Sequence, residues 1–213
     1  MDNVIKQYMS VPFDELNYCM KEGIMYQRDM SVSVAYDNHY FEHYIRLENT
    51  DIAKKLNKGR TELTQKYCNS LLDVGIGSGE FIKESGIAVY GYDINPVAIR
   101  WLRQSGIYRD PYADMPKVDG LSLWDVLEHI PNPNNLLSKV RSGMYVFVSI
   151  PIVSDLIQVK RSKHYKPNEH YYYFTSSGLT RYMDDSGFRL VEMSDQEIRA
   201  GREDIFTFVF VKV

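Results

Sequence analysis

Residues 71–81 read LLDVGIGSGEF, a short apolar run that passes directly into closely spaced glycines. The apolar residues of 71–74 predict a buried strand that carries the single acid Asp73. Strand, glycine turn and helix in this order form the ligand crevice of doubly wound α/β sheets. Glycine suits such a turn because it adopts unusual φ values and lets the backbone approach a ligand without an intervening Cβ. The glycines stand at alternate positions: Gly75, Gly77 and Gly79.

The spacing of these glycines argues against two common phosphate-binding turns. A dinucleotide fingerprint, G-x-G-x-x-G counted from Gly75, needs a third glycine where this chain has Glu80. A P-loop needs Gly-Lys-Ser/Thr after the turn, and none follows. A carboxylate beside a pyrophosphate is electrostatically unfavourable, so the turn suits a ligand that carries an ammonium group and hydroxyls. The alternative is that the glycines serve turn geometry only.

A second acid ends the next predicted strand. Residues 89–95 read VYGYDIN, and Asp93 lies 14 residues after Gly79. A carboxylate at this place can accept both hydroxyl donors of a ribose. Pro96 fits the first turn of a helix over Val97–Arg103. The alternative for Asp93 is therefore a cap of that helix.

The two stretches LLDVGIGSGEF and VYGYDINPVAI resemble the first two motifs of class I S-adenosylmethionine-dependent methyltransferases. The later WDVLEHIPNP resembles the branch that acts mostly on small molecules, and the resemblance covers the chain from Ser70 onward. It implies an enzyme whose cofactor is S-adenosylmethionine. The residues that would hold this methyl donor are Asp73, Gly75, Gly77 and Gly79 for the methionine part, Asp93 for the ribose, Ile94 and Asp110 for the adenine, and Trp124 and Asp125 beneath the methyl group. Asp114 is the alternative to Asp110.

Strands and helices alternate after Ser70, which predicts a mostly parallel sheet. The resemblance implies a Rossmann-like α/β fold with seven strands, an antiparallel last strand and helices on both faces. The expected strands are Leu71–Val74, Val89–Tyr92, Ile107–Asp110, Gly120–Trp124, Met144–Ile150, Phe188–Met193 and Ile205–Val213. A methyltransferase domain is thus expected over residues 69–213.

Residues 1–68 are expected to form an N-terminal helical cap. Apolar spacing predicts helices over Asp14–Tyr26 and around Tyr40–Leu47, and a further one through Ile52, Leu56 and Leu63 that Gly59 interrupts or ends. Residues 31–36, SVSVAY, read as a short extended segment. His39 and His43 have a spacing that metal ligands can have, but a solvated pair is the favoured interpretation.

Two segments carry candidate groups for the methyl acceptor. In WDVLEHIPNP, His129 is a candidate general base, since imidazole titrates near neutral pH. The alternative is that Glu128 and His129 only order the loop.

The second segment is KRSKHYKPNEHYYYFT, Lys160 to Thr175. The resemblance places this loop over the acceptor, with His170 as a catalytic candidate. The candidate substrate-binding residues are His164, Glu169, Tyr171 and Tyr173. A helix capped at Thr175 or Ser176 is expected to follow. A metal site built from His164, Glu169 and His170 is disfavoured, so no metal is expected.

Composition sets the remaining expectations. With 25 basic and 28 acidic residues, the net charge of −3 gives no overall positive field for nucleic acid. The chain also lacks the Asn/Asp-Pro-Pro-Tyr/Phe string and the Pro-Cys pair that DNA methyltransferases use. No apolar run approaches the ~20 residues that span a bilayer, and residues 1–10 lack the apolar core of a signal peptide.

The two cysteines, Cys19 and Cys68, are expected to be reduced thiols in a cytoplasmic protein. We expect a monomer or homodimer that methylates a hydroxyl, carboxyl or amine of a small molecule. Nucleic acid is the second candidate acceptor, because the Lys160–Thr175 loop is basic and aromatic. A non-catalytic binding protein is the alternative class.

Overall fold

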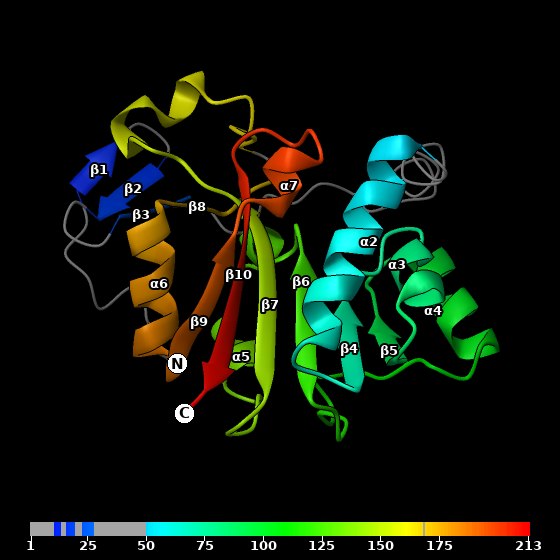
Figure 1. Cartoon of the computed structure of the whole chain (residues 1–213). Helices are drawn as coiled ribbons and strands as arrows, with labels where there is room; N and C mark the ends of the chain where they lie inside the picture. The colour runs from blue at the N-terminus through cyan, green and yellow to red at the C-terminus, as the bar shows by residue number, and fades with distance from the viewer. Residues whose placement is uncertain (1–10, 14–15, 20–22, 28–49, 168) are drawn as a thin grey trace.

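The computed structural model describes residues 11–13, 16–19, 23–27, 50–167 and 169–213, and Figure 1 shows how their elements are arranged. The strands of the central sheet are β4 (Ser70–Val74), β5 (Ala88–Tyr92), β6 (Gly120–Trp124), β7 (Tyr145–Pro151), β9 (Phe188–Ser194) and β10 (Ile205–Lys212). The α-helices are α2 (Asp51–Gln65), α3 (Glu80–Glu84), α4 (Pro96–Gln104), α5 (Asn134–Leu137), α6 (Ser176–Asp185) and α7 (Gln196–Arg199). Two 3₁₀ helices, η2 (Leu127–His129) and η3 (Leu156–Arg161), lie in connections.

The central sheet has the strand order β5-β4-β6-β7-β10-β9. Strands β5, β4, β6 and β7 are parallel, and β10 is antiparallel to both β7 and β9. The predicted antiparallel last strand is therefore confirmed. The strand expected over Ile107–Asp110 is reduced to one parallel bridge, between Tyr108 and Gly91. Pro111 follows directly and has no N–H with which to extend the pairing, so the sheet has six strands among the described residues.

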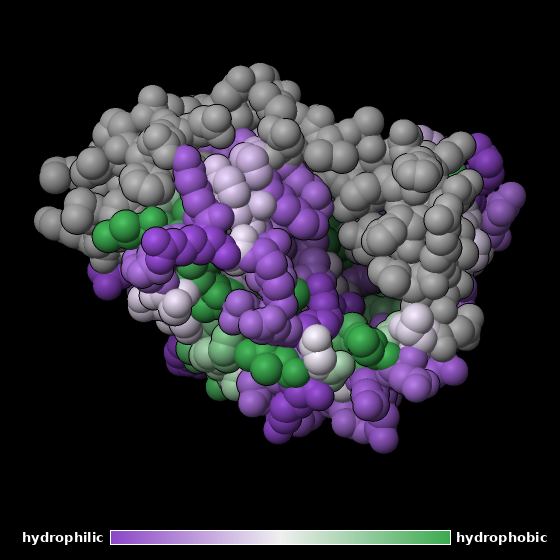
Figure 2. Space-filling model, turned by 90° about the horizontal axis from the view of Figure 1, so that it is seen from above, coloured by the Kyte–Doolittle hydropathy of each residue, from purple (hydrophilic) through white to green (hydrophobic). Residues whose placement is uncertain are grey.

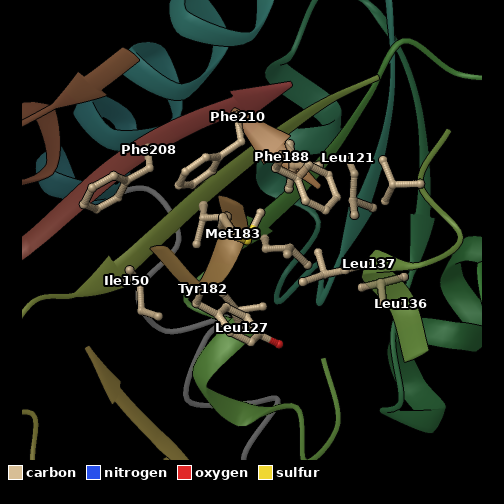
Figure 3. Close-up of a cluster of buried hydrophobic side chains, with 14 of the residues drawn as sticks. Leu121, Leu127, Leu136, Leu137, Ile150, Tyr182, Met183, Phe188, Phe208 and Phe210 are labelled. Atoms are coloured by element: carbon tan, nitrogen blue, oxygen red, sulfur yellow. The ribbon is translucent and has the colours of Figure 1, made fainter. Parts of the chain in front are cut away.

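Side chains alternate between the two faces of the sheet, and helices cover both. In β7, Val146 and Val148 face one hydrophobic cluster, whereas Phe147 faces another. Leu63 of α2 and Phe81 of α3 belong to the cluster of Phe147. The cluster on the opposite face, shown in Figure 3, includes Leu136 and Leu137 of α5, Tyr182 and Met183 of α6, and Phe208 and Phe210 of β10.

Three predictions about helices are confirmed. Pro96 opens α4, Thr175 caps α6 by accepting a hydrogen bond from the backbone N of Gly178 at 3.0 Å, and the apolar pattern through Leu56 forms α2. The expected interruption of α2 is wrong, because the helix continues through Gly59. A glycine weakens a helix interior without ending it when the neighbouring turns are well packed.

No helix in the described part of the chain is long and apolar enough to cross a membrane.

The helix expected over Asp14–Tyr26 is wrong. These residues contribute to a second sheet of order β1-β2-β3-β8, formed by β1 (Val11–Phe13), β2 (Leu16–Cys19), β3 (Ile24–Gln27) and β8 (Tyr172–Phe174), all antiparallel. A spacing of four between apolar residues is even, so it fits one face of a strand as well as a helix. Gly23, at φ 67°, directly precedes β3. The predictions for residues 31–47, His39 and His43 included, lie outside the described residues.

Gly91 of β5 tests how tightly helices pack on the sheet. A Cβ on Gly91 would come within 2.4 Å of Leu102 Cδ2 and 3.0 Å of both Ile76 and Ile82. We expect Gly91→Ala to lower the free energy of unfolding by about 1–3 kcal/mol, the usual cost of overpacking a core. The matched control is Gly59→Ala in α2, where the nearest atom is the flexible Gln196 Oε1 at 3.3 Å. That change should be neutral or stabilising by up to ~1 kcal/mol. Urea unfolding of the three proteins measures both values, and equal effects would contradict the packing argument.

Candidate functional site

A cavity of about 490 Å³ opens at the carboxyl ends of the parallel strands. This end of the molecule faces the viewer in Figure 2, where it is hollowed near its centre. The cavity lining comes from α2, the turn after β4, the end of β5 and the end of β6. Most of the predicted donor-binding residues line it: Asp73, Gly75, Gly77, Asp93, Ile94, Trp124 and Asp125. These residues therefore meet at one cavity, whereas Gly79 and Asp110 are not in its lining, and the role of each residue in donor binding stays a prediction.

The glycine turn has the backbone that only glycine adopts readily. The φ angles are 75° at Gly75, 55° at Gly77 and 77° at Gly79. A Cβ on Gly75 would also lie 2.5 Å from Val126 Cγ2. The backbone N of Gly75 donates a hydrogen bond to the carbonyl oxygen of Tyr92 at 2.8 Å, which fixes the turn against the end of β5. The turn therefore presents bare backbone to the cavity.

Asp73 is a buried acid at the end of β4. Its Oδ1 accepts a hydrogen bond from the Ser122 hydroxyl at 2.6 Å. Burial raises the pKa of Asp73 to about 7, and the nearby Asp93 adds to the rise, while Ser122 and Arg60 oppose it. Asp73 thus titrates near neutral pH in the cavity wall.

Asp93 was interpreted either as a ligand of the ribose or as the cap of α4, and the structure shows that another residue is the cap. The cap of α4 is Asn95, whose Oδ1 accepts a hydrogen bond from the backbone N of Val97 at 2.8 Å. Asp93 Oδ1 instead accepts from the backbone N of Asn95 at 2.7 Å, and the residue lines the cavity. Burial raises the pKa of Asp93, against the opposing effect of backbone N–H donors. Ile94 beside it is 60% exposed, an open apolar surface at the cavity edge.

Asp110 is not among the residues that line this cavity. Its carboxylate accepts hydrogen bonds from the backbone N of Tyr112 and Ala113, at 2.9 and 3.4 Å, and so closes a turn. Asp110 and Asp114 border a separate hollow on the outer side of β5. Tyr112, which sequence reasoning passed over among the acids of this linker, lines the cavity instead and packs edge-on against Tyr92. A contact of Asp110 with adenine stays a prediction, which this placement does not favour.

A cluster of ion pairs fixes the end of β6. Arg202 binds Asp125 with both guanidinium nitrogens, at 2.7 and 3.0 Å, and Arg60 reaches the same carboxylate at 3.4 Å. Glu197, fully buried, accepts from Arg60 at 2.8 Å, from Arg202 at 2.7 Å and from the Ser149 hydroxyl at 2.9 Å. Burial alone would raise the pKa of Asp125, but the two arginines outweigh it and lower the pKa.

Asp125 also has a φ of 56°, which is uncommon for a residue other than glycine. The sequence offered no signal for Arg60, Glu197 and Arg202, because they lie far from Asp125 along the chain. Arg60 also stacks over Trp124, with its Cζ 4.9 Å from the ring centroid. The floor of the cavity is therefore held by residues from several distant segments.

The two catalytic candidates lie together, but only His129 lines the cavity. The rings of His129 and His170 meet edge to face with centroids 4.7 Å apart. His170 is only 4% exposed, and burial together with His129 lowers its pKa to about 3. Burial likewise lowers the pKa of His129. Glu128 beside them is buried, and burial and the nearby Asp125 raise its pKa well above the usual range.

The four predicted substrate-binding residues do not line the cavity. His164 Nε2 contacts the carbonyl oxygen of Glu203 at 2.9 Å, and Glu169 pairs with Lys166 at 3.1 Å. Tyr171 and Tyr173 are buried around β8, where Tyr173 accepts a hydrogen bond from the backbone N of Lys166 at 3.0 Å. Pairing of β8 with β3 buries this tyrosine run, and a pairing so distant in sequence could not be foreseen. Their role in acceptor binding stays a prediction.

Asp73 makes the stability of the donor-free protein depend on pH. Because its folded-state pKa is raised to about 7, the folded protein keeps a proton that the unfolded chain releases near pH 4. Asp73 therefore stabilises the fold fully below about pH 4, and this contribution is lost as the pH rises toward about 7. We expect the free energy of unfolding of wild type minus that of Asp73→Asn to fall across this window. Urea unfolding at a series of pH values measures the difference, and a flat difference would rule the assignment out.

Comparison with known proteins agrees with this geometry. The sequence profile of a methyltransferase domain matches residues 38–193, more than half of the chain. Among curated proteins no significant sequence match is found.

Several solved structures share the fold at low sequence identity. One is the magnesium protoporphyrin IX methyltransferase from Synechocystis with bound S-adenosylhomocysteine, at 15% identity and a TM-score of 0.59, covering 84% of this chain and 96% of that chain. Another is the 1,6-didemethyltoxoflavin-N1-methyltransferase from Burkholderia thailandensis, at 15% identity and a TM-score of 0.54, covering 93% and 99%. A small RNA methyltransferase matches at 16% identity and a TM-score of 0.55, covering 75% of this chain and 25% of that chain.

Proposed function

Since the chain belongs to the methyltransferase domain family, as an enzyme of the class I fold that uses S-adenosylmethionine, we propose that it methylates a small molecule. The observation that carries the proposal is the cavity itself. It joins the glycine turn, Asp93 and His129 in one space of about 490 Å³. This volume lies in the range of small-molecule pockets.

In the proposed complex the donor lies along the glycine turn. Backbone groups at Gly75 and Gly77 bind the methionine part, and the carboxylate of Asp93 accepts the two ribose hydroxyls. Ile94 and Tyr112 offer apolar and aromatic surface for the adenine. Most of these contacts were expected from the sequence, with Tyr112 added by its position in the lining.

The acceptor is proposed to enter beside His129. Its nucleophilic atom attacks the methyl carbon, the carbon–sulfur bond breaks with its electron pair going to sulfur, and the products are the methylated acceptor and S-adenosylhomocysteine. Holding the two reactants in line lowers the barrier by removing translational and rotational freedom in advance. A hydroxyl acceptor also loses its proton during the transfer. His129 and His170 are the candidates to assist that loss, and His129 is the one in the cavity wall.

The charge distribution favours a small acceptor over nucleic acid. Lys163 pairs with Glu203 at 2.7 Å and Lys166 with Glu169 at 3.1 Å, so two cations of the basic loop are already neutralised. A nucleic-acid site needs several cations that are available to phosphates. The likeness to an RNA methyltransferase extends to the fold and carries no information about this acceptor.

Asp93 provides the sharpest test of donor binding. We expect Asp93→Ala to weaken the binding of S-adenosylmethionine by about 1–3 kcal/mol, roughly 5–150-fold in Kd, because a charged hydrogen-bond acceptor is lost. Asp114→Ala is the matched control, since Asp114 lies in the separate hollow and should leave the affinity unchanged. Titration calorimetry measures both, and equal affinities of Asp93→Ala and wild type would contradict the donor pose.

The class of acceptor is open to direct measurement. With S-adenosylmethionine labelled in its methyl group, we expect the protein to transfer label into the small-molecule fraction of a cell extract. The macromolecular fraction, treated in parallel with and without nuclease, is the control. Label found mainly in nuclease-sensitive material would identify nucleic acid as the acceptor and overturn the proposal.

A further inference from the structure

The Glu128 carboxyl group has no role in the donor site and no partner within the described part of the chain. Its side chain is 1% exposed, and neither oxygen has a hydrogen-bond partner there. The nearest cations are engaged elsewhere, Lys166 with Glu169 and Arg202 with Asp125 and Glu197. A buried carboxyl without a partner is destabilising in either protonation state, because the protonated form has a donor to satisfy as well. Such a group indicates a missing partner.

Two imidazoles stand beside this carboxyl group. One potential ligand atom each from Glu128, His129 and His170 lie within 4.8 Å of one another. Among the described residues, the ring of His170 makes an edge contact with His129 and a tilted contact with Tyr173, and no hydrogen bond that would occupy a ring nitrogen. One carboxylate and two imidazoles therefore lie close together beside the cavity, which His129 alone of the three lines.

The hydrogen bond of His129 sets its tautomer. Nδ1 lies 3.0 Å from the carbonyl oxygen of Glu169. A carbonyl oxygen only accepts, so Nδ1 carries the proton and Nε2 carries the lone pair. Histidines that bind metals have this arrangement, in which the other ring nitrogen donates to a carbonyl or carboxylate.

Backbone hydrogen bonds hold the two segments together. The backbone N of Tyr171 donates to the carbonyl oxygen of Glu128 at 2.8 Å. The backbone N of His170 donates to the carbonyl oxygen of Lys166 at 2.8 Å, and its own carbonyl accepts from Gln27 Nε2 at 2.6 Å. The three side chains thus project from main chain that is fixed on both sides. This is the preorganisation that a binding site requires.

We propose that Glu128, His129 and His170 bind one divalent transition-metal ion. A ligand set of two imidazole nitrogens and one carboxylate oxygen suits Zn²⁺, Mn²⁺, Fe²⁺ or Co²⁺, whereas Ca²⁺ and Mg²⁺ prefer oxygen ligands. Bonds of about 2.0–2.2 Å place ligand atoms about 3.0–4.2 Å apart, and these atoms already lie within 4.8 Å of one another, so a small movement of the side chains is enough to bind an ion. The sequence alone gave no expectation of a metal, because Glu128 and His170 meet only in the folded chain.

The ion has a place in the reaction as well. His129 lines the donor cavity, and three protein ligands leave a coordination position for the acceptor. A hydroxyl oxygen bound there has a lowered pKa, so its proton leaves to solvent and its lone pair is available to the methyl carbon. This role rests on the proposed methyl transfer, whereas the binding of the ion does not.

Cobalt is a suitable probe because its ligand field is visible in absorption. Titrating the chelator-treated full chain with Co²⁺, without methyl donor, should give one ion per chain and absorption bands of a nitrogen- and oxygen-ligated site. Zn²⁺ should displace the bound Co²⁺, whereas Mg²⁺ at the same concentration should not. Glu128→Gln and His170→Ala should each weaken Co²⁺ binding at least ~10–100-fold, the loss seen even when a supporting residue of a metal site is removed.

His164→Ala is the matched control, since His164 contacts Glu203 and lies outside the cluster, so its Co²⁺ affinity should equal that of wild type. Binding of S-adenosylmethionine by each variant checks that the site is folded. Wild type that binds no Co²⁺, Zn²⁺ or Mn²⁺ overturns the proposal, and so do folded Glu128→Gln and His170→Ala proteins that keep full affinity. One bound ion in a protein that transfers no methyl group would leave the metal site standing and refute the proposed function instead.

Discussion

The salt-bridge cluster around Arg202 is the interaction on which the geometry of the site most depends. Two carboxylates and two guanidinium groups, from α2, the end of β6, α7 and the loop before β10, meet with balanced charge in a partly buried space in which Glu197 is fully buried. Leaving the buried Glu197 without a cation would cost several kcal/mol, so Arg60 of α2 and Arg202 of the loop before β10 are both held against it. Asp125 is held in its unusual conformation by this demand. The 3₁₀ helix η2 begins at Leu127, two residues after Asp125, and ends at His129. By fixing Asp125, the cluster therefore also anchors the segment that carries His129.

The candidate site shows which parts of function are readable from local sequence. The glycine turn and the acid after the second strand are local features, since each needs only a few consecutive residues, and both line the cavity. The distinction between Asp93 and Asn95 was not readable, because both are polar residues before a proline and only the fold shows which one caps the helix. Arg60 and Arg202 were unpredictable for the opposite reason. Each is one of 25 basic residues, and only tertiary contact distinguishes it.

In the fold, too, features set by local sequence were predicted and features set by long-range pairing were not. A parallel sheet with an antiparallel final strand followed from apolar runs and family motifs, and the structure has it. The N-terminal segment was misassigned because its apolar spacing is compatible with two periodicities, and long-range pairing of β3 with β8 decides between them. That pairing also explains the tyrosines at 171–173. Aromatic side chains beside a basic loop resemble a binding surface in sequence, but here they are buried in two hydrophobic clusters around β8 of the second sheet.

The position of β10 has a consequence for how the chain acquires its fold. β10 lies between β7 and β9, yet it follows both of them in the chain. Until β10 has been synthesised, neither β7 nor β9 has the strand that pairs with both of them in the finished sheet, so each has an unpaired edge that other chains could contact. β10 can pair with both strands only once residues 205–212 have left the ribosome, and Arg202, which binds Asp125, is synthesised immediately before them. Pairing of β10 within the sheet and formation of the Arg202 ion pairs are therefore late and nearly simultaneous steps in folding.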